Sequence, residues 1–218
     1  KRWLGKSLSQ AIIFDFDGTL IDSQKIIYEC FQSVTNYIAP ERIDYAKNIL
    51  IGPPLRDTAS EILGSNHQGK LDEFINLFIE MHDEHIIKNA LPYPYVIKTL
   101  KKLYEIKVLM AIATNKRQAP TIKLINYFGW QDYFISIECS DGQNSTRNKD
   151  EMIQDILNNN VKFNKALFIG DTVNDGLCAN LNKMPFIKAQ YGYGRDQDWS
   201  KVNVKQDIQH FSEILQFI

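Results

Sequence analysis

The chain has 218 residues, with 25 Lys and Arg against 26 Asp and Glu, and its formal net charge is -1 at pH 7. Hydrophobic residues make up 44% and charged residues 23%, a globular composition that excludes disordered, collagen-like and coiled-coil chains. No apolar run approaches the roughly 20 residues that span a bilayer. The near-neutral charge argues against nucleic acid or a membrane as a main partner.

Short apolar runs that end abruptly in polar residues predict the strands of a parallel sheet. The clearest runs are Ala11 to Phe14, Val108 to Ala113 and Ala166 to Ile169. Weaker candidates are Phe134-Ile135 and Phe186-Ile187. Such continuous runs are typical of strands that are buried on both faces.

Apolar residues at helical spacing lie between these runs, for example Val96, Leu100 and Leu103. Alternating strands and helices predict an α/β fold, a Rossmann-like parallel sheet flanked by helices. We assign residues 1–22 and 92–218 to this core.

Residues 23–91 contain no convincing buried strand. Helical spacing of apolar residues predicts one helix around Ile27 to Ile38 and another around Leu71 to Phe78, with a break at Gly52-Pro53-Pro54. We therefore expect a helical unit inserted after the first strand, with a hinge near Pro92 and Pro94.

Polar side chains follow the first strand in the order Asp15, Asp17, Gly18 and Thr19. Gly18 allows the chain to curl, which would bring both carboxylates to one open site. Close like charges of this kind require a cation or a proton. Taken alone, the same residues describe a solvated, capped turn.

Two further polar clusters follow later strands. Thr114-Asn115 offers a hydroxyl and backbone N–H groups for phosphate, and Gly170-Asp171 is followed by Asp175, which adds hard oxygen ligands of the kind that suit Mg²⁺. Lys149 stands just before another predicted helix. Because ligands bind beyond the carboxyl ends of parallel strands, we expect these clusters to converge at one edge of the sheet.

Together these residues resemble the haloacid dehalogenase-like hydrolase superfamily over nearly the whole chain. Asp15-Phe16-Asp17-Gly18-Thr19 resembles the family's nucleophile motif. Thr114-Asn115, Lys149 and Gly170-Asp171 with Asp175 resemble its second, third and fourth motifs. Asp22-Ser23 and the later Tyr191-Gly192-Tyr193-Gly194 are most similar to the phosphoglycolate phosphatase-like branch, and the helical insertion is similar to the family's cap domain.

The resemblance implies a Mg²⁺-dependent phosphatase that forms an aspartyl-phosphate. Asp15 would be the nucleophile and Asp17 the general acid and base, with phosphoglycolate as the best single guess for the substrate. The implied metal site consists of Asp15, the Asp17 carbonyl, Asp171 and Asp175. The implied phosphate-binding residues are Gly18, Thr114, Asn115 and Lys149. The third motif departs from the Lys-Pro of many relatives, so Arg147 and Lys165 are alternatives to Lys149.

Other readings stay open at this stage. A phosphosugar mutase of β-phosphoglucomutase type shares every motif, and a pyrophosphatase or a catalytically silent binding module on the same fold are further alternatives. Arg56 is either a cap residue that contacts the substrate or a surface charge. We interpret Lys116 and Arg117 as solvated charges at a helix start, and His82 and His85 as part of a polar helix face.

The sequence also gives expectations about setting and assembly. Cys30, Cys139 and Cys178 are odd in number and far apart, which fits a reducing compartment better than a disulfide framework. We expect a cytoplasmic monomer or homodimer that acts on a small phosphorylated metabolite.

Overall fold

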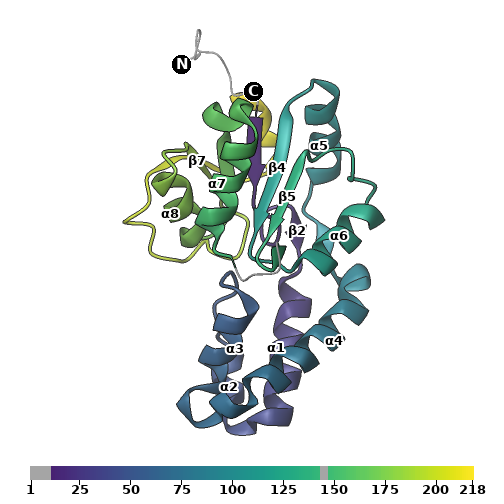
Figure 1. Ribbon diagram of the computed structural model, residues 1–218, viewed down its shortest axis with the longest axis vertical. Helices are drawn as coiled ribbons and strands as arrows, with labels where there is room; N and C mark the ends of the chain where they lie inside the picture. The colour runs from purple at the N-terminus through teal and green to yellow at the C-terminus, as the bar shows by residue number, and fades with distance from the viewer. Residues whose placement is uncertain (1–10, 143–146) are drawn as a thin grey trace.

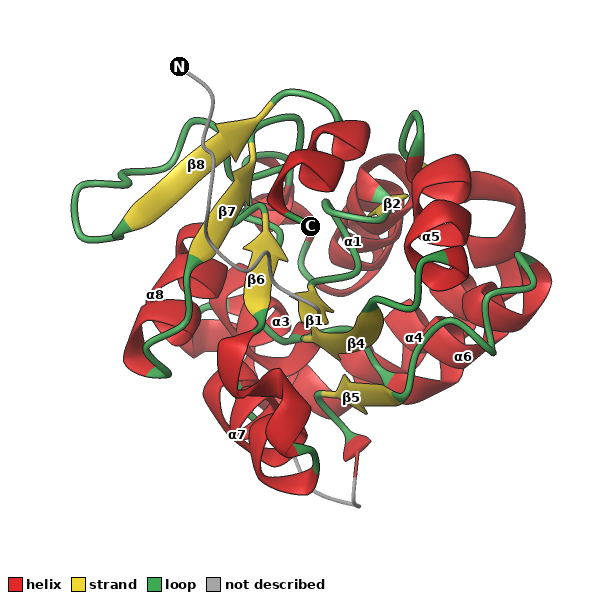
Figure 2. Cartoon of the chain, turned by 90° about the horizontal axis from the view of Figure 1, so that it is seen from above, coloured by secondary structure: helices red, strands yellow, loops and turns green. Residues whose placement is uncertain are grey.

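The computed structural model describes residues 11–142 and 147–218. Its centre is a six-stranded parallel sheet with the strand order β5-β4-β1-β6-β7-β8 (Figure 2). In that order the strands are Ser136–Cys139, Leu109–Thr114, Ala11–Phe14, Leu167–Gly170, Phe186–Ala189 and Val204–Ile208. The predicted α/β fold with a parallel sheet is confirmed.

Helices cover both faces of the sheet, and this explains the continuous apolar strands. In β1, Ile12 and Phe14 pack into one core cluster, while Ala11 and Ile13 pack into the other. The first cluster includes residues of α5 (Val96–Glu105) and α6 (Gln118–Tyr127), and the second includes residues of α7 (Lys149–Asn159) and α8 (Val173–Leu181). A strand buried on both sides needs apolar residues at every position.

The chain between β1 and α5 forms a helical group below the sheet (Figure 1). We call α1, α2, α3 and α4 the cap helices, with the bounds Gln24–Ile38, Ile43–Ala46, Leu55–Leu63 and Leu71–Asn89. A two-stranded antiparallel joint connects them to the sheet, formed by β2 (Ile21–Asp22) and β3 (Leu91–Pro92). The exact division at residues 23–91 stays a prediction.

Short 3-10 helices complete the chain: η1 (Pro40–Arg42), η2 (Ser65–Lys70), η4 (Val161–Lys165) and η5 (Phe211–Phe217). The three cysteines are buried and free. Among the helices of the described chain, none has the length and apolar character needed for a membrane crossing.

Two local features differ from the expectations. The strand expected at Phe134-Ile135 begins at Ser136, because Phe134 packs edge-on against Phe14 and Ile135 is exposed. Strand β8 was not expected, since it is an edge strand with mostly exposed side chains and no apolar run. Helix α3 begins directly after the predicted break at Gly52-Pro53-Pro54.

Candidate active site

The candidate site lies where β1 and β6 end side by side. The backbone N–H of Asp15 donates a hydrogen bond of 2.9 Å to the carbonyl of Ile169, which continues the β1–β6 pairing for one residue beyond the strand. Asp15 follows β1 directly and Asp171 follows β6 directly. The register of two neighbouring parallel strands therefore brings these two carboxylates together.

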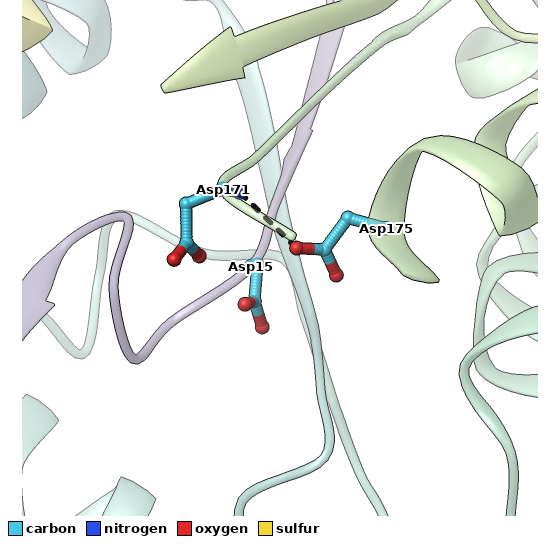
Figure 3. Close-up of side chains that lie close together, drawn as sticks. All are labelled: Asp15, Asp171 and Asp175. Carbon is cyan, nitrogen blue, oxygen red and sulfur yellow. Dashed lines mark hydrogen bonds between the residues drawn. The ribbon is translucent and has the colours of Figure 1, made fainter. Parts of the chain in front are cut away.

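Three buried carboxylates, those of Asp15, Asp171 and Asp175, form the centre of the site (Figure 3). Each offers an oxygen atom that lies within 4.8 Å of the others. Asp171 is fixed from both sides, since Thr19 Oγ1 donates to its Oδ1 at 3.1 Å and the backbone N–H of Tyr193 donates to its Oδ2 at 2.7 Å. The sequence analysis expected the polar clusters at Asp15 and at Asp171 to converge, and these carboxylates lie together here.

Asp175 is held by the start of helix α8. Thr172 is the N-cap residue, and its backbone N–H and hydroxyl both donate to Asp175 Oδ2, at 2.8 and 2.7 Å. The other oxygen of Asp175 accepts a hydrogen bond from Lys149. Both oxygens of Asp175 thus accept hydrogen bonds, and Asp175 holds Lys149 and Thr172 in place.

Lys149 is the buried cation of the site. It is the first residue of α7, whose N-cap Asn148 forms a capping box with Glu151. Its Nζ lies 2.9 Å from Asp15 Oδ1 and also contacts Asp175. The structure thus brings Lys149, rather than the alternative Arg147, to Asp15.

The electrostatics of the cluster favour a bound cation. Burial, followed by the charge of Asp175, raises the pKa of Asp15 to about 7, and burial raises the pKa of Asp171 well above its ordinary value. One lysine cannot balance three carboxylates, so ionisation of the whole set leaves excess negative charge in a buried place. Carboxylate oxygens are the ligands that Mg²⁺ prefers, and the donor set therefore fits such an ion.

Asp17 lies beside this cluster with partners of its own. Lys116 Nζ contacts Asp17 Oδ2 at 2.9 Å, and the hydroxyl of Ser23 donates to Asp17 Oδ1 at 2.6 Å. The hydroxyl of Tyr193 in turn accepts a hydrogen bond from the backbone N–H of Ser23. The side chain of Asp17 is outside the three-carboxylate group. Its acid–base role and the contact of its carbonyl with a metal stay predictions.

Thr114, Asn115 and Gly18, the other residues of the predicted phosphate site, have different surroundings. Thr114 is buried and lines the cavity, whereas Asn115 donates from Nδ2 to the carbonyl of Gly52 and so joins the core to the cap region. Gly18 differs from its prediction as a phosphate-binding residue. Its backbone N–H donates to the carbonyl of Ile21 and is not free for phosphate. At φ +83°, a Cβ on Gly18 would lie 2.2 Å from Asp171 Oδ2, so this glycine makes room for the carboxylate.

Two basic residues from the sequence analysis pair with acidic residues other than Asp15. Arg56 pairs with Asp72 at 2.6 Å on the exposed surface of the cap helices and is not among the described residues that line the cavity, so this structure does not support its predicted substrate contact. Arg147 pairs with Glu138 at 2.7 Å and also contacts Asp155.

Sequence reasoning missed two site residues. Lys116 was interpreted as solvated, but its side chain is only 4% exposed and pairs with Asp17. His82 was assigned to a polar helix face, but it is 2% exposed and lines the cavity. Both are buried where the cap helices meet the core, and no local pattern in the sequence signals that contact.

One cavity connects these groups. It lies between the cap helices and the ends of the strands and has about 680 Å³ of empty volume, part of it open to solvent. Its core side includes Asp15, Asp17, Thr114 and Lys149, so a molecule held there would contact Asp15.

Comparisons with known proteins identify the family. The model of the haloacid dehalogenase-like hydrolases matches residues 12–189. The chain therefore belongs to the haloacid dehalogenase-like hydrolase family, as the motifs predicted, and it is a hydrolase.

Individual relatives agree with this assignment. The chain is 28% identical to a phosphoglycolate phosphatase from Psychrobacter arcticus, with 96% of this chain and 95% of the relative covered. It is 26% identical to a pyrophosphatase from Halalkalibacterium halodurans, with 75% of each covered. The crystal structure of a predicted phosphoglycolate phosphatase from Haemophilus somnus superposes with a TM-score of 0.82 at 18% identity, covering 97% of this chain and 99% of that one, and shows the shared fold.

The close packing around Asp171 gives a first prediction. A Cβ at Gly192 would lie 2.2 Å from Asp171 Cβ and 2.4 Å from the carbonyl oxygen of Gly18, and neither neighbour is a flexible side-chain end. We expect Gly192→Ala to displace Asp171 and to weaken Mg²⁺ binding at least about tenfold, a loss of roughly 1.4 kcal/mol, as measured by calorimetric titration. Gly69→Ala is the control, since no atom lies within 4 Å of its Cβ position. Equal Mg²⁺ affinities for both variants would contradict this account.

The raised carboxyl pKa values give a second prediction. Below pH 7 a proton competes with a cation for Asp15, so Mg²⁺ binding weakens as the pH falls. At a Mg²⁺ concentration about 100 times the Kd, the ion stabilises the protein by about 2.7 kcal/mol, which raises Tm by about 5–10 °C for a chain of this size. We expect a shift of this size at pH 7.5, a smaller one at pH 5.5, and none for Asp171→Asn. A larger shift at pH 5.5 than at pH 7.5 would exclude this competition.

Proposed function

We propose that the protein is a Mg²⁺-dependent phosphatase that hydrolyses a small phosphate monoester through an aspartyl-phosphate on Asp15. The observation that carries the proposal is the buried contact between Lys149 and Asp15, set beside Asp171 and Asp175 in a member of this hydrolase family. A carboxylate nucleophile, a fixed ammonium and a cation site are the parts that phosphoryl transfer requires.

In the first step Asp15 attacks phosphorus and the bond between phosphorus and the ester oxygen breaks. Asp17 supplies the proton that the leaving alcohol needs, and Lys149 balances charge on the transferring phosphoryl group. Mg²⁺, held by Asp15, the Asp17 carbonyl and Asp171, would supply further positive charge at the phosphate oxygens. Ser23 and Lys116 fix the direction of the Asp17 carboxylate.

In the second step a water molecule attacks the phosphorus atom of the aspartyl-phosphate. Asp17 accepts a proton from this water, the bond between phosphorus and Asp15 breaks, and inorganic phosphate leaves. Asp17 thereby regains the proton that it gave to the alcohol, so the cycle closes without net release of a proton. Closure of the cap helices over the partly open cavity would exclude bulk water during these steps.

The names of the relatives support phosphoglycolate and pyrophosphate as the first substrates to test. Both carry a phosphoryl group on a small leaving group. Release of phosphate, measured together with isomer formation on hexose phosphates, separates a phosphatase from a mutase.

The nucleophile is tested by Asp15→Asn. We expect this change to lower Mg²⁺-dependent release of p-nitrophenol from p-nitrophenyl phosphate by at least about 10³-fold, because the amide cannot form the acyl phosphate. The wild-type protein, quenched in acid during turnover, should carry one phosphoryl group on the peptide that contains Asp15, as seen by mass spectrometry. Asp22→Asn is the control, since Asp22 is exposed in β2. Normal turnover by Asp15→Asn would refute the covalent mechanism.

A further inference from the structure

Ser23 at the start of α1 uses its side chain in an unusual way. It is the N-cap residue of this helix, but its hydroxyl makes no cap hydrogen bond. An N-cap serine usually accepts a hydrogen bond from a backbone N–H of the first helical turn. Here the hydroxyl instead donates to Asp17 Oδ1 at 2.6 Å, so this side chain holds Asp17 rather than capping the helix.

The hydroxyl of Tyr193 contacts Ser23 at two atoms. It accepts a hydrogen bond of 2.9 Å from the backbone N–H of Ser23, and it lies 3.1 Å from Ser23 Oγ. The carbonyl oxygen of Ile21 lies 3.3 Å from the same hydroxyl. Ser23 is fully buried, so these contacts satisfy polar groups that bulk water does not reach.

The proton positions in this chain of hydroxyls follow from the charge of Asp17. Its carboxylate forms an ion pair with Lys116, and an ionised carboxylate can only accept hydrogen bonds. The single hydroxyl proton of Ser23 is therefore donated to Asp17. The contact between the two hydroxyls then requires Tyr193 as the donor and Ser23 Oγ as the acceptor. Tyr193 thus holds both the backbone and the hydroxyl of Ser23.

The position of Tyr193 is itself set by the carboxylate cluster. Its backbone N–H donates to Asp171 Oδ2 at 2.7 Å. Both neighbours of Tyr193 are glycines that pack closely against the same segment. A Cβ at Gly192 would lie 2.2 Å from Asp171 Cβ, and a Cβ at Gly194 would lie 2.3 Å from the Asp171 carbonyl oxygen. The backbone of Tyr193 is therefore held against Asp171 on both sides.

One side chain thus connects the proposed metal site to the proposed general acid. The backbone of Tyr193 contacts Asp171, and its hydroxyl contacts the serine that donates to Asp17. Lys116 also contacts Asp17, but a lysine presents a point charge on a flexible stem. The directional constraint on the Asp17 carboxylate therefore comes mainly from Ser23. A general acid must lie within hydrogen-bond reach of the atom that it protonates, so its direction determines whether it can act.

We propose that Tyr193 is a positioning residue whose hydroxyl, acting through Ser23, directs the Asp17 carboxylate toward the oxygen of the leaving alcohol. This inference rests on the proposed phosphatase function and adds the class of ester whose hydrolysis depends on Tyr193. The alcohol of an alkyl ester such as phosphoglycolate leaves as a strongly basic alkoxide unless Asp17 protonates it. p-Nitrophenolate is a weak base and leaves without a proton, so its ester needs this alignment much less.

The change Tyr193→Phe removes the hydroxyl and keeps the ring and the backbone contact with Asp171. We expect it to lower kcat/KM for phosphoglycolate and ethyl phosphate at least about tenfold more than kcat/KM for p-nitrophenyl phosphate, because kcat/KM reports on cleavage of the ester bond. Tyr191→Phe is the matched control, since the Tyr191 hydroxyl donates to the Thr19 carbonyl from the same loop. It should change the three values by the same factor.

A double variant tests whether Tyr193 acts through Ser23. We expect Ser23→Ala to lower hydrolysis of the alkyl esters selectively, as Tyr193→Phe does. In the Ser23→Ala background, Tyr193→Phe should add less than about a twofold selective loss, because changes within one hydrogen-bonded chain are not additive. An undiminished selective loss in the double variant would contradict a path through Ser23.

Two measurements do not depend on turnover. In a crystal structure of the Tyr193→Phe variant, we expect the Asp17 carboxylate to lose its contact with Ser23 Oγ or to occupy two directions. Asp171 should keep its hydrogen bond to the backbone N–H at position 193. Calorimetric titration should give a Kd for Mg²⁺ within about twofold of the wild-type value, since that backbone contact is kept.

Failure of this inference is distinct from failure of the proposed function. An equal loss of kcat/KM on all three esters, or an Asp17 carboxylate that stays on Ser23 in the crystal structure of Tyr193→Phe, would overturn the role of Tyr193 and leave the phosphatase intact. A Kd for Mg²⁺ raised as much as in Gly192→Ala would assign Tyr193 to the metal site and would also overturn it. Absence of all Mg²⁺-dependent hydrolysis by the wild-type protein would overturn the proposed function, and the crystal structure would still decide whether Tyr193 holds Asp17 in place.

Discussion

The central constraint of this structure is that three buried carboxylates, those of Asp15, Asp171 and Asp175, lie close together beyond the ends of β1 and β6. Like charges in a buried place repel strongly, and they stay together here because the β1–β6 register fixes the backbone on either side of them. Lys149 offsets part of the charge, and the raised pKa values of Asp15 and Asp171 reflect what it leaves uncompensated. The fold thus prepares a place for a cation before any cation binds.

One loop connects this charged centre to the cap joint. The backbone of Tyr193 holds Asp171, while its hydroxyl contacts Ser23 at the start of α1 and Tyr191 donates to the carbonyl of Thr19. The same Ser23 donates to Asp17. The groups proposed to bind the cation, to transfer the proton and to carry the cap helices are therefore linked by direct hydrogen bonds, so a shift of the cap region acts on the direction of Asp17.

The site residues that directly follow strands could be predicted from the sequence. Asp15 and Asp171 were expected to meet because both follow buried apolar runs, and Lys149 was expected nearby through its resemblance to a motif. The burial of Lys116 and His82 was not predicted, because it depends on how the cap helices pack against the core. Arg56 was ambiguous for the same reason, since its pairing with Asp72 depends on contact between two helices.

The central claim is that the carboxylate cluster binds one divalent cation, and its most direct test is crystallographic. Crystals soaked in Mn²⁺, which takes the same hard oxygen ligands as Mg²⁺, can be measured at a wavelength where manganese scatters anomalously. The account predicts a single strong anomalous peak within coordination distance of both Asp15 and Asp171. A cluster that stays free of manganese at saturating Mn²⁺, with both carboxylates in place, would contradict it.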